Sequence, residues 1–343
     1  MALIKWFYRV VFLLITLSAI LAGYLYYSIT VPVTLTSVET FEVRAGDTSH
    51  SLGDELNEKG LIAYPFLTRV ASKLNPEWVP KVGKYAIQPE MNLLDIMALF
   101  DSGQSIFYSI TLLEGKTTQD FLLAMKARGN ITMTLLDSSN EEIVEKLGLE
   151  VEHPEGQFFA NTYRYHEGDT DASILKHAHE LMTQTLTDLW KHKAPDLPYK
   201  SAYEALVMAS IIEKETGVPD ERPLIAQVFI SRLKKGMRLQ TDPTVIYGLG
   251  DSFKGNLTRK GLQDSSPYNT YRFYGLPPSP IANVGREAIE AALNPEQTKA
   301  LYFVAKGDGT HAFSNTLIEH NQAVRKYQFK RREDYRSTPK NAK

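Results

Sequence analysis

Residues 201–217 read SAYEALVMASIIEKETG, and this pattern predicts a buried helix that carries one acidic side chain on an apolar face. At about 100° per residue, Ala205, Ala209 and Glu213 fall on one side of the helix. The opposite side is also partly apolar, so we expect the helix to be buried and its alanines to leave a shallow groove before Glu213. Gly217 and the proline soon after it predict that the helix ends shortly after Glu213.

An acidic side chain in this place is expected to have unusual acid–base properties. Burial disfavours the charged form, and the negative end of the helix dipole adds to this, so both would raise the pKa of Glu213. A protonated carboxyl group beside a groove can serve as a general acid. The alternative is a buried glutamate that an arginine or backbone amides hold in place, and the helix by itself leaves both open.

The composition limits the kinds of protein that this chain can be. Its 343 residues suffice for about two domains, and a formal net charge of −2 argues against a nucleic-acid partner. With no cysteine, the chain has no disulfide, no thiolate nucleophile and no cysteine metal site. The eight histidines show no metal-ligand spacing such as HExxH, and neither a phosphate loop nor a serine elbow is found. We therefore expect neither a metal nor a cofactor.

The N-terminal segment has the features of a single transmembrane helix. Residues 10–29, VVFLLITLSAILAGYLYYSI, carry no charge and match the length needed to cross a membrane. Lys5 and Arg9 precede them, which by the positive-inside rule keeps residues 1–9 in the cytoplasm and everything beyond a linker at 30–39 outside it. The aromatic residues expected at the membrane interfaces are Trp6, Phe7, Tyr24, Tyr26 and Tyr27. A cleaved signal peptide is the alternative, but the apolar run is longer than usual and no clear cleavage site follows.

Residues 40–103 predict a small module with a strand, two helices and a second strand. A further helix follows from Asn92 to Ser102, which we expect Asn92 to cap and Gly103 to end. Its opening, residues 41–48, has the pattern F-x-V-x-x-G-D-T and turns at Gly46. This opening resembles a LysM module, a small fold that binds N-acetylated glycans. The alternative is a structural α+β module that binds nothing.

Residues 104–330 predict a larger mixed α+β domain that carries the buried helix, so we expect the α+β class for the chain as a whole. The amphipathic segment 135–147 is expected at its periphery. The other expected elements are a strand from residue 105, helices at about 117–127, 173–191 and 224–235, and a polar tail at 331–343.

Loops rich in Pro, Gly, Asn and Tyr follow the buried helix and suit a groove that grips a neutral polymer through hydroxyl and acetamide groups. They comprise residues 237–248, 266–271, 275–281 and 288–294. Asp242 stands directly before Pro243 and could equally be a turn former. The segment 153–165 mixes aromatics with turn residues, which fits either a carbohydrate-facing loop or core aromatics in a β-turn. His311 fits either a residue with a role in binding or a surface residue whose hydrogen bonds are satisfied.

Five motifs are spread over the second half of the chain. They are ASIIEKET (209–216), LQTDPTVIYG (239–248), SPYNTY (266–271), GLPPSPI (275–281) and LYFVAKGDGTHAF (301–313). With these motifs the chain resembles the YceG-like family of endolytic murein transglycosylases, and the resemblance extends over nearly its whole length. The departures are mild: PEGQFFANTY at 154–163 is looser than E-G-x-x-F-P-D-T-Y, and Ser279 stands where glycine is common.

The resemblance implies an enzyme that cuts the β-1,4 bond between N-acetylmuramic acid and N-acetylglucosamine without using water. Glu213 would protonate the leaving oxygen and then, as a carboxylate, take the proton of the muramyl 6-hydroxyl, which closes a 1,6-anhydro ring. The residues expected to shape the groove are Gln240, Thr241, Asp242, Tyr247, Tyr268, Asn269 and Glu155.

The family further implies a bacterial inner-membrane protein whose catalytic part lies in the periplasm. There it would cut nascent glycan strands beside peptidoglycan polymerases and so end their elongation. Two other functions stay open. A muramidase hydrolase would use water and needs a second carboxylate, for which Asp242 and Glu155 are the candidates. A noncatalytic glycan-binding scaffold would be favoured if a buried arginine neutralised Glu213.

Overall fold

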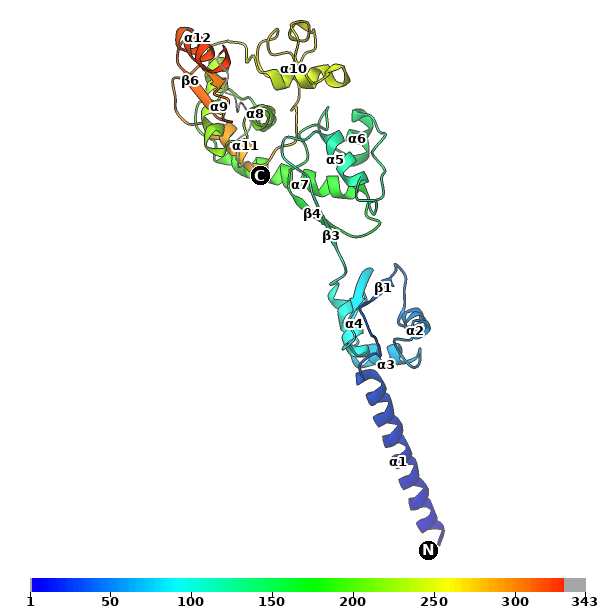
Figure 1. Cartoon of the computed structure of the whole chain (residues 1–343). Helices are drawn as coiled ribbons and strands as arrows, with labels where there is room; N and C mark the ends of the chain where they lie inside the picture. Colours follow the sequence, from blue (N-terminus) through cyan, green and yellow to red (C-terminus); the bar gives the residue numbers. More distant parts are fainter. Residues whose placement is uncertain (1, 330–343) are drawn as a thin grey trace. The chain divides into compact units, whose positions relative to one another are not determined.

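The structure is a computed structural model that describes residues 2–329, drawn in Figure 1. Its residue contacts divide the chain into two compact units, Met1–Tyr108 and Ser109–Lys343, which we call the first and the second unit. Both units combine helices with short two-stranded sheets, as the α+β class requires. The polar tail expected at residues 331–343 lies outside the described residues.

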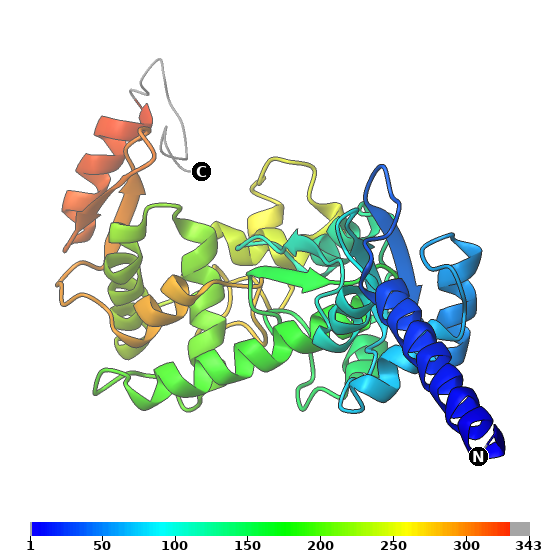
Figure 2. The same cartoon turned by 90° about the horizontal axis from the view of Figure 1, so that it is seen from below.

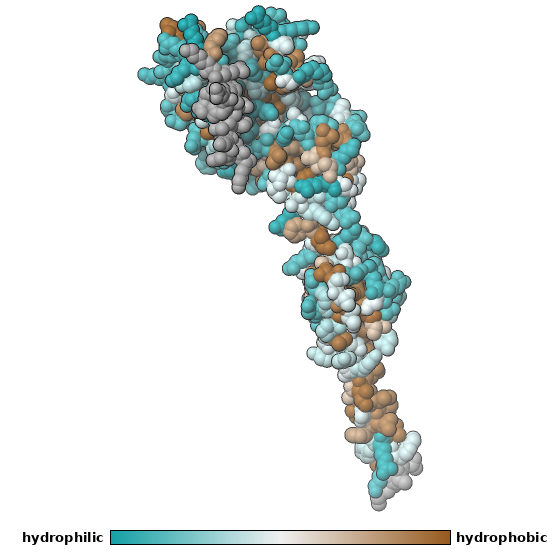
Figure 3. All heavy atoms as spheres, in the orientation of Figure 1, coloured by the Kyte–Doolittle hydropathy of each residue, from teal (hydrophilic) through white to brown (hydrophobic). Residues whose placement is uncertain are grey.

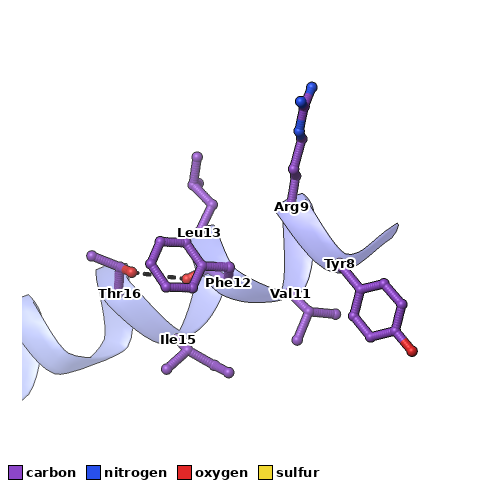
Figure 4. A pocket seen from close by; sticks show the side chains of 7 residues that line it. All are labelled: Tyr8, Arg9, Val11, Phe12, Leu13, Ile15 and Thr16. Carbon is purple, nitrogen blue, oxygen red and sulfur yellow. Dashed lines mark hydrogen bonds between the residues drawn. The ribbon is translucent and has the colours of Figure 1, made fainter. Parts of the chain in front are cut away.

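The first unit begins with a long apolar helix, α1 (Ala2–Thr30). Residues Ile4–Thr30 form a helix that is long and apolar enough to cross a membrane, and the most apolar stretch of this helix is not buried by the rest of the protein. Figure 3 shows this apolar surface along α1. The hollow drawn in Figure 4 is lined only by side chains of α1 between Tyr8 and Thr16, so it is a groove on one helix and not a cavity. A surface of this kind suits lipid chains.

The remainder of the first unit has the expected order of strand, two helices, strand and further helix. Its elements are β1 (Glu39–Val43), α2 (Ser49–Glu58), α3 (Leu67–Leu74), β2 (Gly83–Ile87) and α4 (Leu93–Ser102). The two strands pair antiparallel with Phe41 opposite Tyr85, and both rings are buried against Phe100 at centroid distances of 5.2 and 5.0 Å. Asn92 caps α4 and Gly103 ends it in the left-handed conformation, as the sequence predicts.

The second unit begins with a small sheet and three helices. Its elements up to residue 191 are β3 (Tyr108–Thr111), α5 (Thr118–Lys126), α6 (Asn140–Leu147), β4 (Thr162–Tyr165) and α7 (Asp171–Lys191). β3 pairs with β4, and Thr117 caps α5. Leu135, Ile143 and Leu147 are buried in the core below α5 and α7, so the prediction that 135–147 is peripheral is wrong. The apolar side of this segment is part of the core, and only its other side is polar.

The aromatic residues of the segment 153–165 belong to the same core. Phe158, Tyr163 and Tyr165 are buried together with side chains of α5 and α7. The Tyr163 hydroxyl donates to the carbonyl of Phe159 at 2.5 Å, which satisfies its polar end inside the core. These aromatic residues are therefore core residues, as the second interpretation of the segment expects.

The buried helix is present where the sequence predicts it, at the centre of the second unit. The elements of this part are α8 (Ala202–Glu215), η1 (Pro219–Glu221), α9 (Arg222–Lys234), α10 (Asp242–Leu249), η2 (Gly250–Ser252), η3 (Gly261–Gln263), α11 (Arg286–Leu293), β5 (Tyr302–Ala305), β6 (His311–Ser314), α12 (Leu317–Val324) and a π-turn (Arg325–Phe329). Ser201 caps α8, and every residue from Ala205 to Ile212 is buried. α8 packs against α9, α11 and α7, which lie around it in Figure 2.

Three expectations for this region are corrected by the packing. Ala205 and Ala209 are fully buried in the core that α8 shares with α11, so no groove runs beside them, and their small size permits close helix packing instead. Residues 288–294 form most of α11 and are not a loop. Asp242 and Pro243 begin α10 and do not form a turn, because proline is well tolerated in the first helical turn, where its missing N–H is not needed.

Candidate functional site

A polar groove of about 840 Å³ opens beside the last turn of α8. One wall is the segment 111–116 that follows β3, and another is the segment 160–162 that leads into β4. Residues 213–217 and Arg222, at the start of α9, complete it. The groove in front of Glu213 therefore exists, but distant segments of the second unit form it and the alanines of α8 do not.

Glu213 lies in this groove with a side chain that is only 6% exposed. Its Oε1 is 3.4 Å from Nη2 of Arg222, and its Oε2 accepts from the backbone N–H of Gly285 at 3.5 Å. Burial raises the pKa of Glu213 above its ordinary value; Arg222 opposes this, and the neighbouring Glu114 adds to it. The net direction agrees with the expectation for a general acid.

Arg222 is the buried arginine that the sequence left as an alternative partner of Glu213. Its guanidinium is 8% exposed and contacts Glu213, Glu114 at 3.9 Å and, most closely, Glu287. Its positive charge is thus shared among three carboxylates, and its lowering effect on the pKa of Glu213 is smaller than the raising effect of burial. Nothing in the sequence pattern singled out Arg222, Glu114 or Glu287, since they come from separate segments.

The wall of the groove is held by backbone contacts. Gly115 donates its N–H to the carbonyl of Asn283 at 2.9 Å, and Asn283 donates its own N–H to the carbonyl of Lys116 at 2.9 Å. Lys214 donates to the carbonyl of Gly115 at 3.0 Å. A Cβ atom at Gly285 would overlap the carboxylate of Glu114, so any larger residue there would displace the Glu114 side chain from its present position. These contacts fix the position of the groove wall relative to α8.

A second polar pocket, of about 490 Å³, lies beside Glu215. Its lining includes Gln240, Thr241 and Asp242, so these expected substrate residues belong to this pocket and not to the lining of the Glu213 groove. Glu215 lines both spaces and accepts a short hydrogen bond from Thr241. Burial raises its pKa, with Thr241 opposing the shift.

Two further contacts shape this second pocket. The Tyr271 hydroxyl donates to Oδ1 of Asp242 at 2.6 Å, so Asp242 holds a neighbouring loop as well as beginning α10. His311 lies 2.7 Å from Oε2 of Glu221 and also lines the pocket. His311 is thus a paired side chain at a pocket and not a surface residue.

The other expected substrate residues are held inside the protein. Glu155 is 4% exposed, and its Oε1 accepts from Thr118 N–H at 2.9 Å and from Nδ2 of Asn283 at 3.1 Å. The Tyr247 hydroxyl donates to Oε2 of Glu155 at 3.4 Å. Burial raises the pKa of Glu155 to about 7. Glu155 therefore lies behind the wall of the groove and does not line it.

Tyr268 and Asn269 brace the loop after α10. The Tyr268 ring lies 4.9 Å from that of Tyr247, and its hydroxyl is 2.5 Å from the hydroxyl of Ser279. Asn269 is fully buried and donates to the carbonyls of Leu262 and Asp264 at 3.1 and 2.7 Å. These contacts hold the loop in place, and neither residue lines the groove beside Glu213.

The site combines an acid of raised pKa, a shared arginine and a polar groove, a set of features that suits acid–base chemistry on a polar ligand. Among residues 2–329, no group of three or more His, Asp or Glu side chains is arranged to hold a metal ion. The sequence model of the YceG-like family matches residues 41–326. The chain belongs to the YceG-like family, which confirms the resemblance that the motifs indicate.

Several proteins are similar to this chain. The endolytic murein transglycosylase of Bacillus subtilis is 35% identical over 264 residues, which cover 72% of this chain and 73% of that protein. The endolytic murein transglycosylase of Streptococcus pneumoniae serotype 2 is 25% identical over 319 residues, or 83% of this chain and 57% of its own length. A crystal structure of a YceG-like protein from Listeria monocytogenes is 31% identical, with a TM-score of 0.49, and the match covers 84% of this chain and 99% of that one.

Proposed function

We propose that this chain is a lytic transglycosylase that cuts the β-1,4 bond between N-acetylmuramic acid and N-acetylglucosamine in peptidoglycan. Its relatives are named endolytic murein transglycosylases. The observation that carries the proposal is Glu213, a largely buried acid of raised pKa at the side of an open polar groove. Such a group can be protonated when a glycan strand arrives and still reach its glycosidic oxygen.

In the first step, protonated Glu213 gives its proton to the glycosidic oxygen as the bond from that oxygen to C1 of the muramyl residue breaks. In the second step, the Glu213 carboxylate takes the proton of the muramyl 6-hydroxyl, and O6 forms a new bond to C1. The products are a free 4-hydroxyl on N-acetylglucosamine and a 1,6-anhydromuramyl end. No water is consumed, and Glu213 returns to its protonated form.

The surroundings of Glu213 fit both steps. Burial and the neighbouring Glu114 favour the protonated acid needed first. Arg222 and the N–H of Gly285 then stabilise the carboxylate that remains after the proton has left. One carboxyl group with these opposing neighbours can act as the acid and then as the base.

A muramidase hydrolase is the second candidate function. It is favoured by one contact, which brings a second carboxylate into the same groove. Glu114 lines the same groove, is 48% exposed and contacts the same Nη2 atom of Arg222 as Glu213 does. A hydrolase needs a second carboxylate to position a water or to form a covalent intermediate. In the hydrolase alternative, Glu114 would be this second carboxylate. Asp242 and Glu155 would not, because neither of them lines the groove.

Mass analysis of fragments from purified murein distinguishes the candidates. We expect the wild-type product to carry an anhydro end, one water lighter than the hydrolysed equivalent and inert to reducing agents. Glu213→Gln should give no product, whereas Glu180→Gln, at an exposed glutamate of α7, should behave as wild type. Reducing ends that disappear with Glu114→Gln would establish the hydrolase instead. Binding of glycan without any cleavage would support a noncatalytic scaffold.

We further propose that α1 anchors the protein in the bacterial inner membrane, with the second unit in the periplasm. The support is the apolar length of Ile4–Thr30 and the position of Lys5 and Arg9 at its N-terminal side. A reporter that is active only in the periplasm should work when fused after the C-terminus and fail when fused before Lys5. The reverse pattern would place the second unit in the cytoplasm, away from peptidoglycan.

The finer parts of the proposal concern the glycan strand. An anchored enzyme would meet strands as polymerases release them, so cleavage there would end their elongation. The LysM-like order of the first unit suggests that residues 40–103 hold the strand. Deleting these residues should weaken binding to long strands more than it slows cleavage of short soluble fragments. Equal losses would instead make the module a structural part of the enzyme.

A further inference from the structure

The loop between α2 and α3 carries two exposed aromatic rings next to α1. Tyr64 and Phe66 are 43% and 39% exposed, and their rings stack with centroids 5.8 Å apart. The Tyr24 hydroxyl of α1 donates to the Tyr64 hydroxyl at 3.3 Å. We call Tyr64 and Phe66 the aromatic ledge. It lies beside a residue of the apolar helix although it belongs to the folded module.

The end of α1 is packed firmly into that module. Ile29 is 1% exposed and shares the core with Val33, and Val33 donates its N–H to the carbonyl of Met91 at 2.8 Å. The helix therefore enters the module with a defined direction. Tyr24 precedes the last residue of α1 by six positions, or about 9 Å at 1.5 Å per residue. The ledge thus lies back along the helix, toward the membrane side of the module.

The length of α1 places Tyr24 and the aromatic ledge at the boundary of the membrane. Residues Ile4–Thr30 span about 40 Å, whereas the hydrocarbon core of a bilayer is about 30 Å thick. If the core begins between Lys5 and Arg9, it ends about 20 residues later, between residues 25 and 30. Tyr24 and the ledge then lie at the outer boundary of the hydrocarbon, where aromatic rings are favoured.

We propose that the aromatic ledge lies in the phospholipid headgroup layer, so that the module rests on the membrane surface beside its own anchor. In water, the apolar surface of the two stacked rings would stay exposed, which is unfavourable. The membrane interface can bury the rings and still hydrate the Tyr64 hydroxyl. Arg69 and Lys73 are exposed on α3, directly after the ledge, and suit the phosphates of the headgroups. The proposal rests on α1 crossing the membrane.

The test uses the full chain in phosphatidylcholine and phosphatidylglycerol vesicles. Because the chain has no cysteine, single substitutions can be labelled with an environment-sensitive fluorophore without altering other residues. Phe66→Cys reports on the ledge. Val79→Cys is the matched control, since Val79 is 66% exposed and its N–H donates to Asp101 in the last turn of α4. The opposite end of α4 is the one next to the end of α1, because Met91 before its first turn accepts from Val33. Leu17→Cys, within α1, reports on the anchor.

We expect lipids that carry a nitroxide on the headgroup to quench the label at residue 66 at least threefold more than the label at residue 79. Iodide in water should quench the label at 79 more than that at 66. Equal behaviour of the two labels would overturn the proposal for the ledge. If lipids with a nitroxide in the acyl chain quench the label at Leu17 in that case, the anchor stands and only the ledge is refuted. Absence of quenching at Leu17 would refute the anchor itself, and the ledge with it.

Discussion

Glu213 and Glu155 are two largely buried carboxyl groups of the second unit, and burial raises the pKa of both. They differ in what faces them. Glu213 faces a polar groove of about 840 Å³, whereas Glu155 is enclosed by donors from Thr118, Asn283 and Tyr247. A raised pKa therefore does not identify a catalytic acid by itself, because the acid must also reach a substrate.

The two groups are nevertheless connected through one segment. The side chain of Asn283 donates to Glu155, and its backbone pairs with Gly115 and Lys116 in the groove wall. Two residues further on, the N–H of Gly285 donates to Glu213. Glu155 is thus placed to hold the wall from behind, while Glu213 is the group to which we assign the chemistry. Substitutions of these residues and their neighbours test this division of roles.

Replacing Glu213 with Gln should have the largest effect. The amide keeps the shape of the side chain but cannot deliver a proton, and general acid catalysis typically contributes about 10²–10⁴-fold. We expect murein cleavage to fall by at least that factor, while binding of glycan strands and the unfolding temperature stay close to wild type. Retained activity would show that Glu213 is not the general acid. The proposed difference in role between Glu213 and Glu155 would then no longer hold.

Glu114 and Arg222 should move the pH dependence of cleavage in opposite directions. The alkaline limb of the pH–rate profile reports loss of the proton from Glu213. Arg222 lowers the pKa of Glu213, so Arg222→Gln should shift that limb to higher pH. Glu114 raises the pKa of Glu213, so Glu114→Gln should shift the limb to lower pH. If both substitutions shift the alkaline limb in the same direction, or leave it in place, Arg222 and Glu114 do not control the pKa of the catalytic acid in the proposed way.

Glu215→Gln should reduce cleavage less than tenfold. Glu215 also has a raised pKa and lines the groove, but it extends into the second pocket and accepts from Thr241. Glutamine retains an acceptor for that hydrogen bond. Thr241→Val, which removes the donor, should give a similar or slightly greater loss. If Glu215→Gln abolishes cleavage as completely as Glu213→Gln, the acid assignment must include Glu215.

Glu155→Gln should change stability more than activity. The pKa of Glu155 rises from about 4.5 when unfolded to about 7 when folded, so the native state binds more protons between these values. The free energy of unfolding of the wild type should therefore fall as pH rises from about 4.5 to 7, by roughly 3 kcal/mol from this group. The variant should lack that contribution and cleave murein within about threefold of wild type.

Thermal unfolding across this pH range checks the prediction for Glu155. Replacing Trp6 and Trp78 with Phe leaves Trp190 as the reporter of the second unit, since the chain has three tryptophans. A wild type and variant with the same dependence on pH would show that Glu155 keeps its ordinary pKa. A loss of cleavage comparable to that of Glu213→Gln would instead place Glu155 in the chemistry.

Local sequence signals were sufficient for much of the fold. Asn92 caps the helix that it was expected to cap, because a capping side chain bonds within its own turn. The long apolar run of α1 and the order of elements in the first unit follow in the same way from periodicity and turn residues. An error arose where packing decided, because the amphipathic segment 135–147 contributes core residues. For the aromatic residues of 153–165, packing decided between two interpretations that the sequence left open.

The sequence by itself determined that α8 is buried and that Glu213 occupies an apolar face in its last turn, because both follow from a period of 3.6 residues. Only the tertiary structure decided that Arg222, Glu114 and Gly285 surround Glu213, since they meet it from separate segments. Only the tertiary structure also separated residues 240–242 and Glu155 from the groove. Spacing along the chain describes one helix, whereas a groove is made by whichever distant segments pack against it.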